Sequence, residues 1–177
     1  TIMYMEKGLD TGDMLLKESL SFDNESFGEI HDALADLGGK MIIEAIEKIK
    51  DGSLNPEKQD DALSNYAEKI TKEDTVIDFG NSASTINNQI RALSPTPCAI
   101  ANINDRKIKF VKTCVIDDNS NGSIGEIINV SPKGDGFIDV KTGNGTLRIL
   151  RLIPEGKKEM PATSWACGIK NLEKFGE

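Results

Sequence analysis

Five short apolar segments between residues 98 and 152, separated by turn residues, constrain the fold more than any other feature of this chain. The first two segments flank a turn at Asn104-Asp105, and the last two flank Gly143-Asn144-Gly145. Another turn is expected at Ser131–Gly136. Short strands with glycine-rich turns at this spacing are typical of a small antiparallel barrel. The sequence therefore predicts a five-stranded β-barrel that is OB-like in strand count.

Helices are expected upstream of these strands. Ser26 and Glu29 have the spacing of a capping box, and apolar residues then recur at steps of three and four, which predicts one amphipathic helix over 26–50. A shorter helix is expected to begin near Ser82 or Ser84 and to end before Pro95. The charged, apolar-poor stretch between the two helices predicts a linker, with one helical turn around residues 66–70.

The chain opens with an apolar stretch, Thr1–Met5, which predicts a buried strand already under way. A turn-rich segment and a second extended segment from Met14 to Phe22 follow. Because the first strand has no initiator methionine or leader before it, we expect a fragment that lacks an N-terminal part. The patterns together predict an α+β, multi-domain chain. Its two domains are residues 1–54 and residues 76–177, and a linker at 55–75 joins them.

Charge is distributed unevenly between the two halves. Residues 1–74 hold 8 basic and 18 acidic side chains, whereas residues 75–177 hold 13 and 11. The second half is therefore better suited to a polyanion. Hydrophobic residues at 38% argue against disorder, and no apolar run approaches the roughly 18 residues of a membrane helix. The three cysteines form no C-x-x-C pair, which favours a reducing compartment over a disulfide framework.

Few residues offer chemistry by their pattern alone. His31 is the only histidine, and its place on the predicted helix indicates a partly exposed residue and no zinc site. Neither of the common glycine-rich phosphate-binding motifs occurs. The loop Leu9–Asp13 allows two interpretations: an ordinary hairpin turn, or a carboxylate beside a buried strand, desolvated and used in proton transfer.

Three stretches of the chain resemble one known family, in the family's order. The segment Ile2–Leu15, with Gly8-Leu9-Asp10-Thr11-Gly12-Asp13 inside it, looks like the part of methionyl-tRNA formyltransferases that carries their catalytic aspartate. Tyr66–Glu73 followed by Ile77-Asp78-Phe79 resembles their interdomain linker, and Pro154–Ala162 resembles their C-terminal motif. The first stretch is shared with other formyltetrahydrofolate-using enzymes, whereas the other two point to the tRNA enzyme.

The resemblance implies a fold, an activity and a set of partners. The fold would be the C-terminal remnant of a Rossmann-like formyltransferase domain, a linker and an OB-like β-barrel. The activity would be formyl transfer from N10-formyltetrahydrofolate, without a metal, to the α-amine of methionine on initiator tRNA. Asp10 would be the catalytic carboxylate, and the pterin would meet Gly8, Leu9, Thr11 and Gly12. The enzyme would be a monomer in the cytoplasm, or in an organelle.

The chain departs from this family at two points. The family's catalytic Asn and His, which polarise the formyl oxygen, lie upstream of the matching segment, and His31 does not match that His. The S-L-L-P signature is also missing. We therefore expect the fragment alone to be catalytically inactive.

Basic residues of the linker and the barrel are the candidates for tRNA contact. The alternative is ordinary solvated strand edges, where lysine blocks edge pairing. Trp165 is expected to pack in the interior rather than to stack on a base. The candidate tRNA-binding residues are Lys69, Lys72, Arg106, Lys107, Lys109, Arg148, Arg151, Lys157 and Lys158.

Two further classes of function remain open from the sequence. A sugar-nucleotide formyltransferase, or the hydrolase-like domain of a formyltetrahydrofolate dehydrogenase, would share Asp10. A non-catalytic RNA-binding OB-like module would use only the barrel. The linker and C-terminal motifs favour the tRNA enzyme over both.

Overall fold

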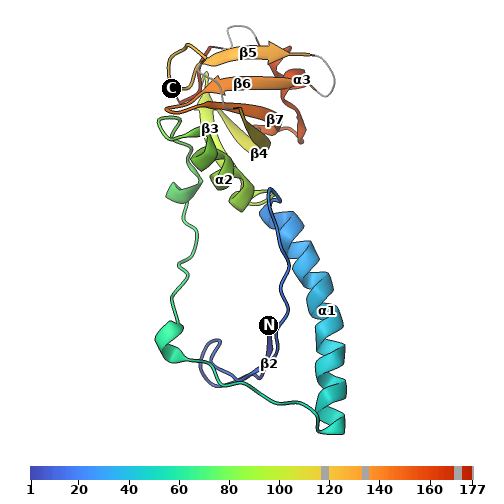
Figure 1. The fold of residues 1–177 in the computed structure, drawn as a ribbon. Helices are drawn as coiled ribbons and strands as arrows, with labels where there is room; N and C mark the ends of the chain where they lie inside the picture. The colour runs from blue at the N-terminus through green and yellow to red at the C-terminus, as the bar shows by residue number, and fades with distance from the viewer. Residues whose placement is uncertain (117–119, 133–135, 170–172, 177) are drawn as a thin grey trace. The chain divides into compact units, whose positions relative to one another are not determined.

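The computed structural model describes residues 1–116, 120–132, 136–169 and 173–176 (Figure 1). Two compact units make up the chain. Unit 1 comprises residues 1–25 and 29–69, and unit 2 comprises residues 26–28 and 70–177. The division at 69/70 falls inside the stretch where the sequence predicts a linker. Among the described residues, no helix combines the length and the apolar character that a bilayer-spanning segment needs.

Unit 1 holds a two-stranded hairpin and one long helix. Strand β1 (Ile2–Met3) pairs antiparallel with β2 (Met14–Leu16). Helix α1 (Phe27–Asp51) begins and ends within one residue of its predicted limits (Figure 1). The prediction of a buried strand over residues 1–5 is wrong, because β1 covers two residues, both half-buried, and Tyr4 and Met5 are exposed. An apolar run predicts burial, but no described part of the chain covers this one.

The predicted helical turn around residues 66–70 is also wrong, since this segment is irregular. Short 3₁₀ helices form on either side of it, at Asp61–Leu63 and Glu73–Thr75. Asp60 caps the first by accepting a hydrogen bond from the Ala62 amide at 3.0 Å. Asp74 accepts hydrogen bonds from the amide and hydroxyl of Thr71 at 2.7 and 2.9 Å, which lower the pKa of its carboxyl. Local side-chain acceptors therefore decide where the turns form.

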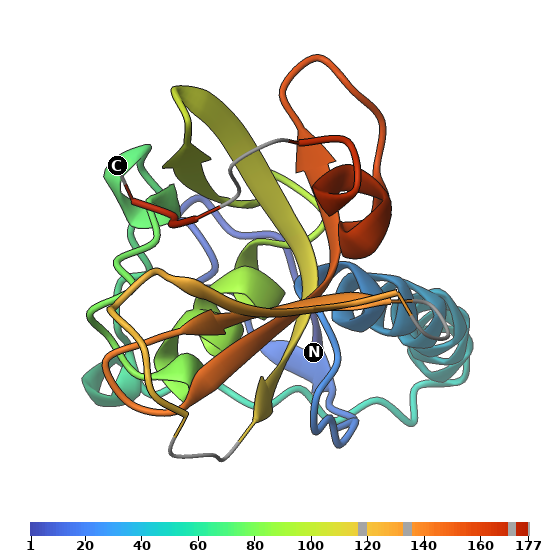
Figure 2. The same cartoon turned by 90° about the horizontal axis from the view of Figure 1, so that it is seen from above.

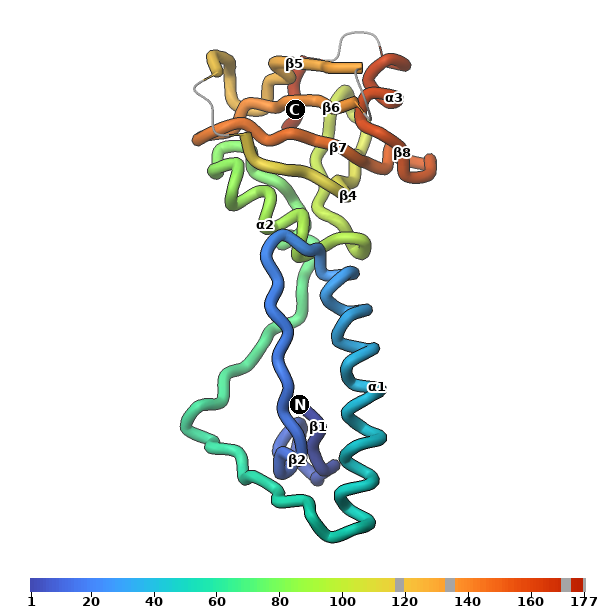
Figure 3. Tube along the Cα trace, turned by 45° about the vertical axis from the view of Figure 1, so that its right-hand side comes forward, coloured from blue at the N-terminus to red at the C-terminus, as the bar shows by residue number. Residues whose placement is uncertain are grey.

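Unit 2 is built on an antiparallel sheet with the strand order β3-β4-β7-β6-β5, and β8 pairs with β7 (Figure 3). The five apolar segments of the sequence correspond to the five strands of this path. Their bounds are β3 (Ala99–Ile103), β4 (Arg106–Ile116), β5 (Ile127–Ser131), β6 (Phe137–Lys141) and β7 (Thr146–Pro154), followed by β8 (Met160–Pro161). Asn104 and Asp105 both have positive φ in the turn between β3 and β4. The central residues of the predicted Ser131–Gly136 turn lie outside the described ranges.

Two helices pack on this sheet. Helix α2 (Ala83–Leu93) is capped by Ser82, whose hydroxyl accepts from the Thr85 amide, and lies against β4 and β7 (Figure 2). Helix α3 (Ala162–Ala166) follows β8 and contacts β6 and β7. Ile86 and Ile90 of α2 are fully buried over the sheet. The start of α2 and its end before Pro95 are as predicted.

Aromatic rings join the two ends of unit 2. Phe175 stacks on Phe79 at 5.6 Å and on Trp165 at 5.9 Å between ring centroids, and its edge meets Phe110 at 5.4 Å. Trp165 is 6% exposed, so its predicted packing role is confirmed. Buried aromatic groups of this kind dominate the energetics of small cores.

The barrel predicted for this unit is not confirmed, because the described part of the chain contains no ladder between the outer strands β3 and β5. The segment Glu173–Gly176 hydrogen-bonds toward both edges instead. Its Phe175 amide donates to the Gly125 carbonyl, just before β5, and its Gly176 amide donates to the Asn102 carbonyl of β3. Alternating apolar residues predict strands, but closure depends on long-range pairing that the pattern does not contain.

Candidate functional site

The loop that contains Asp10 connects β1 to β2 and is held in a tight hairpin. The Tyr4 amide donates to the Asp13 carbonyl at 3.0 Å. At Gly12, an added Cβ would lie 1.8 Å from the Tyr4 carbonyl oxygen. No other residue fits there without moving the backbone, so Gly12 serves the close approach of the two strands.

A second segment of unit 1 fixes the same loop from outside. The side-chain amide of Gln59 donates to the carbonyls of Asp10 and Gly12, both at 2.7 Å. Met14 and Glu57 exchange two backbone hydrogen bonds of 2.8 Å. Asp10 itself adopts a left-handed φ of 53°. The sequence pattern did not indicate Gln59, because its partners are backbone atoms 47 and 49 residues away.

These two segments line an open groove of about 720 Å³. Leu9, Asp10 and Thr11 contribute from the loop, and Gln59 and Tyr66 contribute from the other side. Gly8 is exposed and Gly12 is buried, and neither lines the groove. The carboxylate of Asp10 is exposed. The expectation that a buried strand desolvates this carboxylate is therefore wrong for the chain as described, because β1 is itself only half-buried.

Three of the predicted basic residues come together in unit 2. Lys107, Lys109 and Lys157 line a groove of about 290 Å³ with Ile153 and Pro154. Lys107 and Lys109 alternate with buried Ile108 on β4, so their side chains share the outer face of the sheet. Glu155 also lines the groove, so three lysines and one carboxylate surround its apolar residues.

Lys112 extends this basic face, although the clusters of basic residues in the sequence did not indicate it. Its Cα pairs with Arg151 on β7, after a register shift between Phe110 and Lys112. That irregularity places Lys112, an even-numbered residue, on the face of the odd-numbered Lys107 and Lys109. Arg151 also forms an ion pair with Glu159. The bulge is not visible in the sequence, which explains why the pattern missed Lys112.

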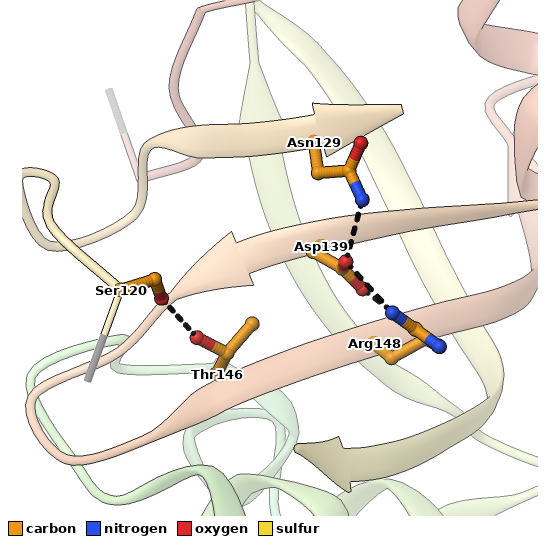
Figure 4. Close-up of polar contacts among 5 residues, drawn as sticks. All are labelled: Ser120, Asn129, Asp139, Thr146 and Arg148. Atoms are coloured by element: carbon orange, nitrogen blue, oxygen red, sulfur yellow. Dashed lines mark hydrogen bonds and ion pairs between the residues drawn. The ribbon is translucent and has the colours of Figure 1, made fainter. Parts of the chain in front are cut away.

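Arg148 does not behave as a free cation (Figure 4). Its guanidinium donates to both carboxylate oxygens of Asp139, at 2.7 and 2.9 Å, and lies 3.5 Å from the centre of the Phe137 ring. Asn129 donates a further hydrogen bond to Asp139 at 3.0 Å. The side chain of Asp139 is 8% exposed. The ion pair engages the guanidinium of Arg148 within the sheet, and contact of Arg148 with RNA stays a prediction.

The remaining basic candidates do not line the Lys107–Lys157 groove. Lys69 belongs to unit 1, whereas Lys72 and Lys158 are exposed residues of unit 2. Arg106 lines a different pocket, of about 230 Å³, beside Trp165. Of the nine basic candidates, therefore, only Lys107, Lys109 and Lys157 line one common groove.

Other reactive side chains of the described residues are dispersed. His31 is exposed on α1, with Nδ1 3.1 Å from Asp32. Burial raises the thiol pKa of Cys98 and of Cys114, although a lysine near Cys98 and Arg148 near Cys114 oppose the shift. Within the described ranges, no three His, Cys, Asp or Glu side chains are grouped as metal ligands.

Sequence comparison defines the class of this protein. The family model for the C-terminal domain of formyl transferases matches residues 69–170, which is more than half of the chain. The chain therefore belongs to the formyl transferase family.

Two curated relatives show which members of this family the chain is similar to. A methionyl-tRNA formyltransferase of Syntrophomonas wolfei subsp. wolfei is 37% identical over 170 residues, 95% of this chain and 53% of the relative. Another, from Citrifermentans bemidjiense, is 40% identical over 171 residues, 96% of this chain and 52% of the relative. The chain spans about half the length of these relatives. The resemblance to methionyl-tRNA formyltransferases inferred from the motifs is confirmed.

The fold recurs in a more distant protein. HypX from Aquifex aeolicus, solved in complex with tetrahydrofolic acid, matches with a TM-score of 0.74 at 15% identity, over 94% of this chain and 29% of HypX. A variant of HypX with four substitutions gives the same TM-score over 30% of that chain. At this identity the match establishes a shared fold.

Proposed function

We propose that this chain is part of an enzyme that transfers a formyl group from N10-formyltetrahydrofolate to the α-amine of methionine on initiator tRNA. The observation that carries the proposal is the 37–40% identity to methionyl-tRNA formyltransferases over 95–96% of the chain, covering both units. A free RNA-binding module would not require the hairpin and groove of unit 1 to be retained.

Asp10 is the proposed catalytic residue. The α-amine attacks the formyl carbon, the amine loses a proton, and N10 of the folate leaves and gains one, so that formylmethionyl-tRNA and tetrahydrofolate result. A carboxylate at Asp10 accepts the amine proton. The groove beside Asp10 has the size of a small-molecule site, and we assign the folate to it. Leu9 and Thr11 would contact the folate from the groove wall, and Gly8 and Gly12 belong to the loop that presents them. The proposal includes a Rossmann-like origin for the first 54 residues.

The proposed tRNA surface is the outer face of β4 and β7. Lys107, Lys109 and Lys157 supply the rim of the groove, with Lys112 and Arg151 beside them. Lysine and arginine contacts to phosphates give affinity and register without reading sequence. We assign the unit to an OB-like fold on its strand number, and the enzyme to the cytoplasm as a monomer. Lys69, Lys72, Arg106 and Lys158 are secondary candidates for tRNA contact.

The test uses the full-length enzyme of which this chain is part, supplied with formyltetrahydrofolate. Methionyl initiator tRNA is expected to be formylated, whereas an amino-sugar nucleotide is not. Release of formate without an acceptor would indicate the hydrolase-like alternative. The 177-residue chain alone is expected to be inactive, because the Asn and His that polarise the formyl oxygen in this family have no match in it. Formylation by the purified chain alone would overturn that assignment.

A further inference from the structure

Gln59 contacts the tip of the Asp10 loop rather than the strands that flank it. Its Nε2 group donates to the carbonyl oxygens of Asp10 and Gly12, both at 2.7 Å. The hairpin itself is closed elsewhere, by the Tyr4 amide on the Asp13 carbonyl and by the close approach of the backbone at Gly12. The pairing of β1 with β2 therefore does not depend on Gln59, and its two hydrogen bonds act on the loop between these strands.

The segment that carries Gln59 is anchored independently on both sides. Before it, Glu57 exchanges two backbone hydrogen bonds of 2.8 Å with Met14, and its carboxylate pairs with Lys17 at 2.5 Å. After it, the Asp60 carboxylate caps the short 3₁₀ helix that follows. Gln59 is half-buried between these anchors. Its amide thus reaches the loop from a fixed base, and a substitution at Gln59 leaves the anchors in place.

Asp10 needs such support because residues other than glycine seldom adopt its backbone conformation. Its φ is 53°, in the left-handed region, where the Cβ atom lies too close to the following carbonyl oxygen. Gln59 holds the carbonyl of Asp10 itself, so it restrains the peptide plane next to the Cα–Cβ bond. The Asp10 side chain is exposed. The backbone, rather than packing, therefore sets the direction of its carboxylate.

We propose that Gln59 is a positioning residue for proton transfer, because it keeps the Asp10 carboxylate directed at the reacting amine. This inference rests on the proposed role of Asp10 as the proton acceptor. A misplacement of about 1 Å at a catalytic group can cost about 10²-fold in rate. Both N–H groups of the Gln59 amide are used on the loop, so neither is left to hold a ligand. The effect of Gln59 should therefore appear in kcat rather than in KM.

The test compares Gln59→Leu and Gln59→Glu in the full-length enzyme. Leucine removes both donors without adding charge, whereas glutamate keeps the shape but turns an acceptor toward two carbonyl oxygens. We expect kcat to fall about tenfold with leucine and further with glutamate, while KM for formyltetrahydrofolate and for tRNA changes less than about twofold. The matched control is Asn55→Asp, the same amide-to-carboxylate change at an exposed position of the same segment. It should keep nearly full turnover.

Combination with Asp10→Asn distinguishes positioning from a separate role. If Gln59 acts through the Asp10 carboxylate, Gln59→Leu should change kcat by less than about twofold once that carboxylate is gone. Effects that multiply would overturn the proposal. A raised KM with unchanged kcat would also overturn it, since Gln59 would then be a ligand contact. A lower unfolding midpoint with unchanged kcat would make Gln59 a purely structural residue.

Release of tetrahydrofolate is the measured reaction, because it reports formyl transfer to any acceptor, water included. Release without formylation of methionyl-tRNA would refute the proposed function, and the same comparison of kcat on that release would still decide the role of Gln59. Hydrogen exchange of the Thr11 and Gly12 amides provides a readout without turnover. Gln59→Leu should accelerate this exchange relative to Asn55→Asp, and equal exchange in the two variants would contradict the proposal.

Discussion

Asp10 is positioned by its backbone rather than by its side chain. Gln59 holds the carbonyl of Asp10, and the close approach at Gly12 fixes the loop. A change at the carboxylate should therefore leave the hairpin intact. In the full-length enzyme, Asp10→Asn keeps the shape but cannot accept a proton. We expect kcat to fall by about 10²–10⁴ while KM for both substrates changes little.

Asp13 provides the control for this measurement. It lies in the same loop, and its backbone carbonyl receives the Tyr4 amide, a bond that Asp13→Asn retains. This variant should keep nearly full turnover. A turnover of Asp10→Asn within a few-fold of the unsubstituted enzyme would identify Asp10 as a turn residue, the other interpretation of the loop.

The three cysteines should differ in reactivity with pH. Burial raises the thiol pKa of Cys98 and Cys114, which lowers their thiolate fraction at any pH below that pKa, and the thiolate is the nucleophile. Cys167 is exposed. At pH 8 we expect iodoacetamide to modify Cys167 first, with the other two gaining reactivity only as pH rises further. Peptide mass spectrometry over time measures this order; equal rates at Cys114 and Cys167 would contradict it.

At the scale of elements, the sequence predicted those parts of the fold that depend on neighbouring residues. The spacing of apolar residues located α1, and Ser82 with Pro95 delimited α2. The turn at Asn104-Asp105 separated β3 from β4 correctly, because left-handed backbone favours Asn and Asp. Each of these signals acts within a few residues along the chain.

Features that depend on distant residues could not be predicted in this way. The pairing of Arg148 with Asp139 follows from the register between β6 and β7. The position of Lys112 follows from a bulge, and the support of the Asp10 loop follows from Gln59. Residue type alone made Arg148 a candidate for RNA contact. The residue opposite it on the neighbouring strand determines whether a charged side chain forms an ion pair within the sheet.

The Arg148–Asp139 pair should contribute to the stability of the sheet. Arg148→Met leaves a carboxylate that is 8% exposed without its counter-charge. Because Arg148 is itself 26% exposed, we expect a loss of about 2–3 kcal/mol, below the 3–5 kcal/mol of a fully buried pair. Adding Asp139→Leu should recover much of it. Urea unfolding of both variants measures these losses; equal loss in the single and double variants would show that the unpaired carboxylate is not its cause.

The affinity of the β4–β7 face for tRNA should fall when a lysine that lines its groove is removed. Lys157 lines the groove with Lys107 and Lys109, whereas the adjacent Lys158 does not. Lys157→Ala in the full-length enzyme should weaken initiator and elongator tRNA alike and reduce the salt slope by about one. Lys158→Ala is the matched control and should change less. Titrations at several salt concentrations distinguish them; loss of affinity for one tRNA alone would mean that Lys157 reads identity.

At the scale of the whole molecule, the two units differ in what stabilises them. Unit 2 contains the connected apolar core, the stacked aromatic rings and the long β4–β7 ladder. Unit 1 depends on a two-stranded hairpin, the helix α1 and a few backbone hydrogen bonds. A two-stranded hairpin is marginally stable in water. Stability should therefore reside in unit 2, and the proposed folate site should order fully only in the complete enzyme.

A truncation tests this division. A chain of residues 70–177 should fold alone and unfold in urea with nearly the same midpoint and slope as residues 1–177, because the slope follows the surface that a cooperative core exposes. Trp165 is the only tryptophan and lies in the unit 2 core, so its fluorescence follows this transition in both chains. Residues 1–69 alone should show no cooperative transition by circular dichroism. Cooperative unfolding of residues 1–69 would show that unit 1 has a stabilising interior of its own. A substantially lower midpoint for residues 70–177 would show that unit 2 depends on unit 1.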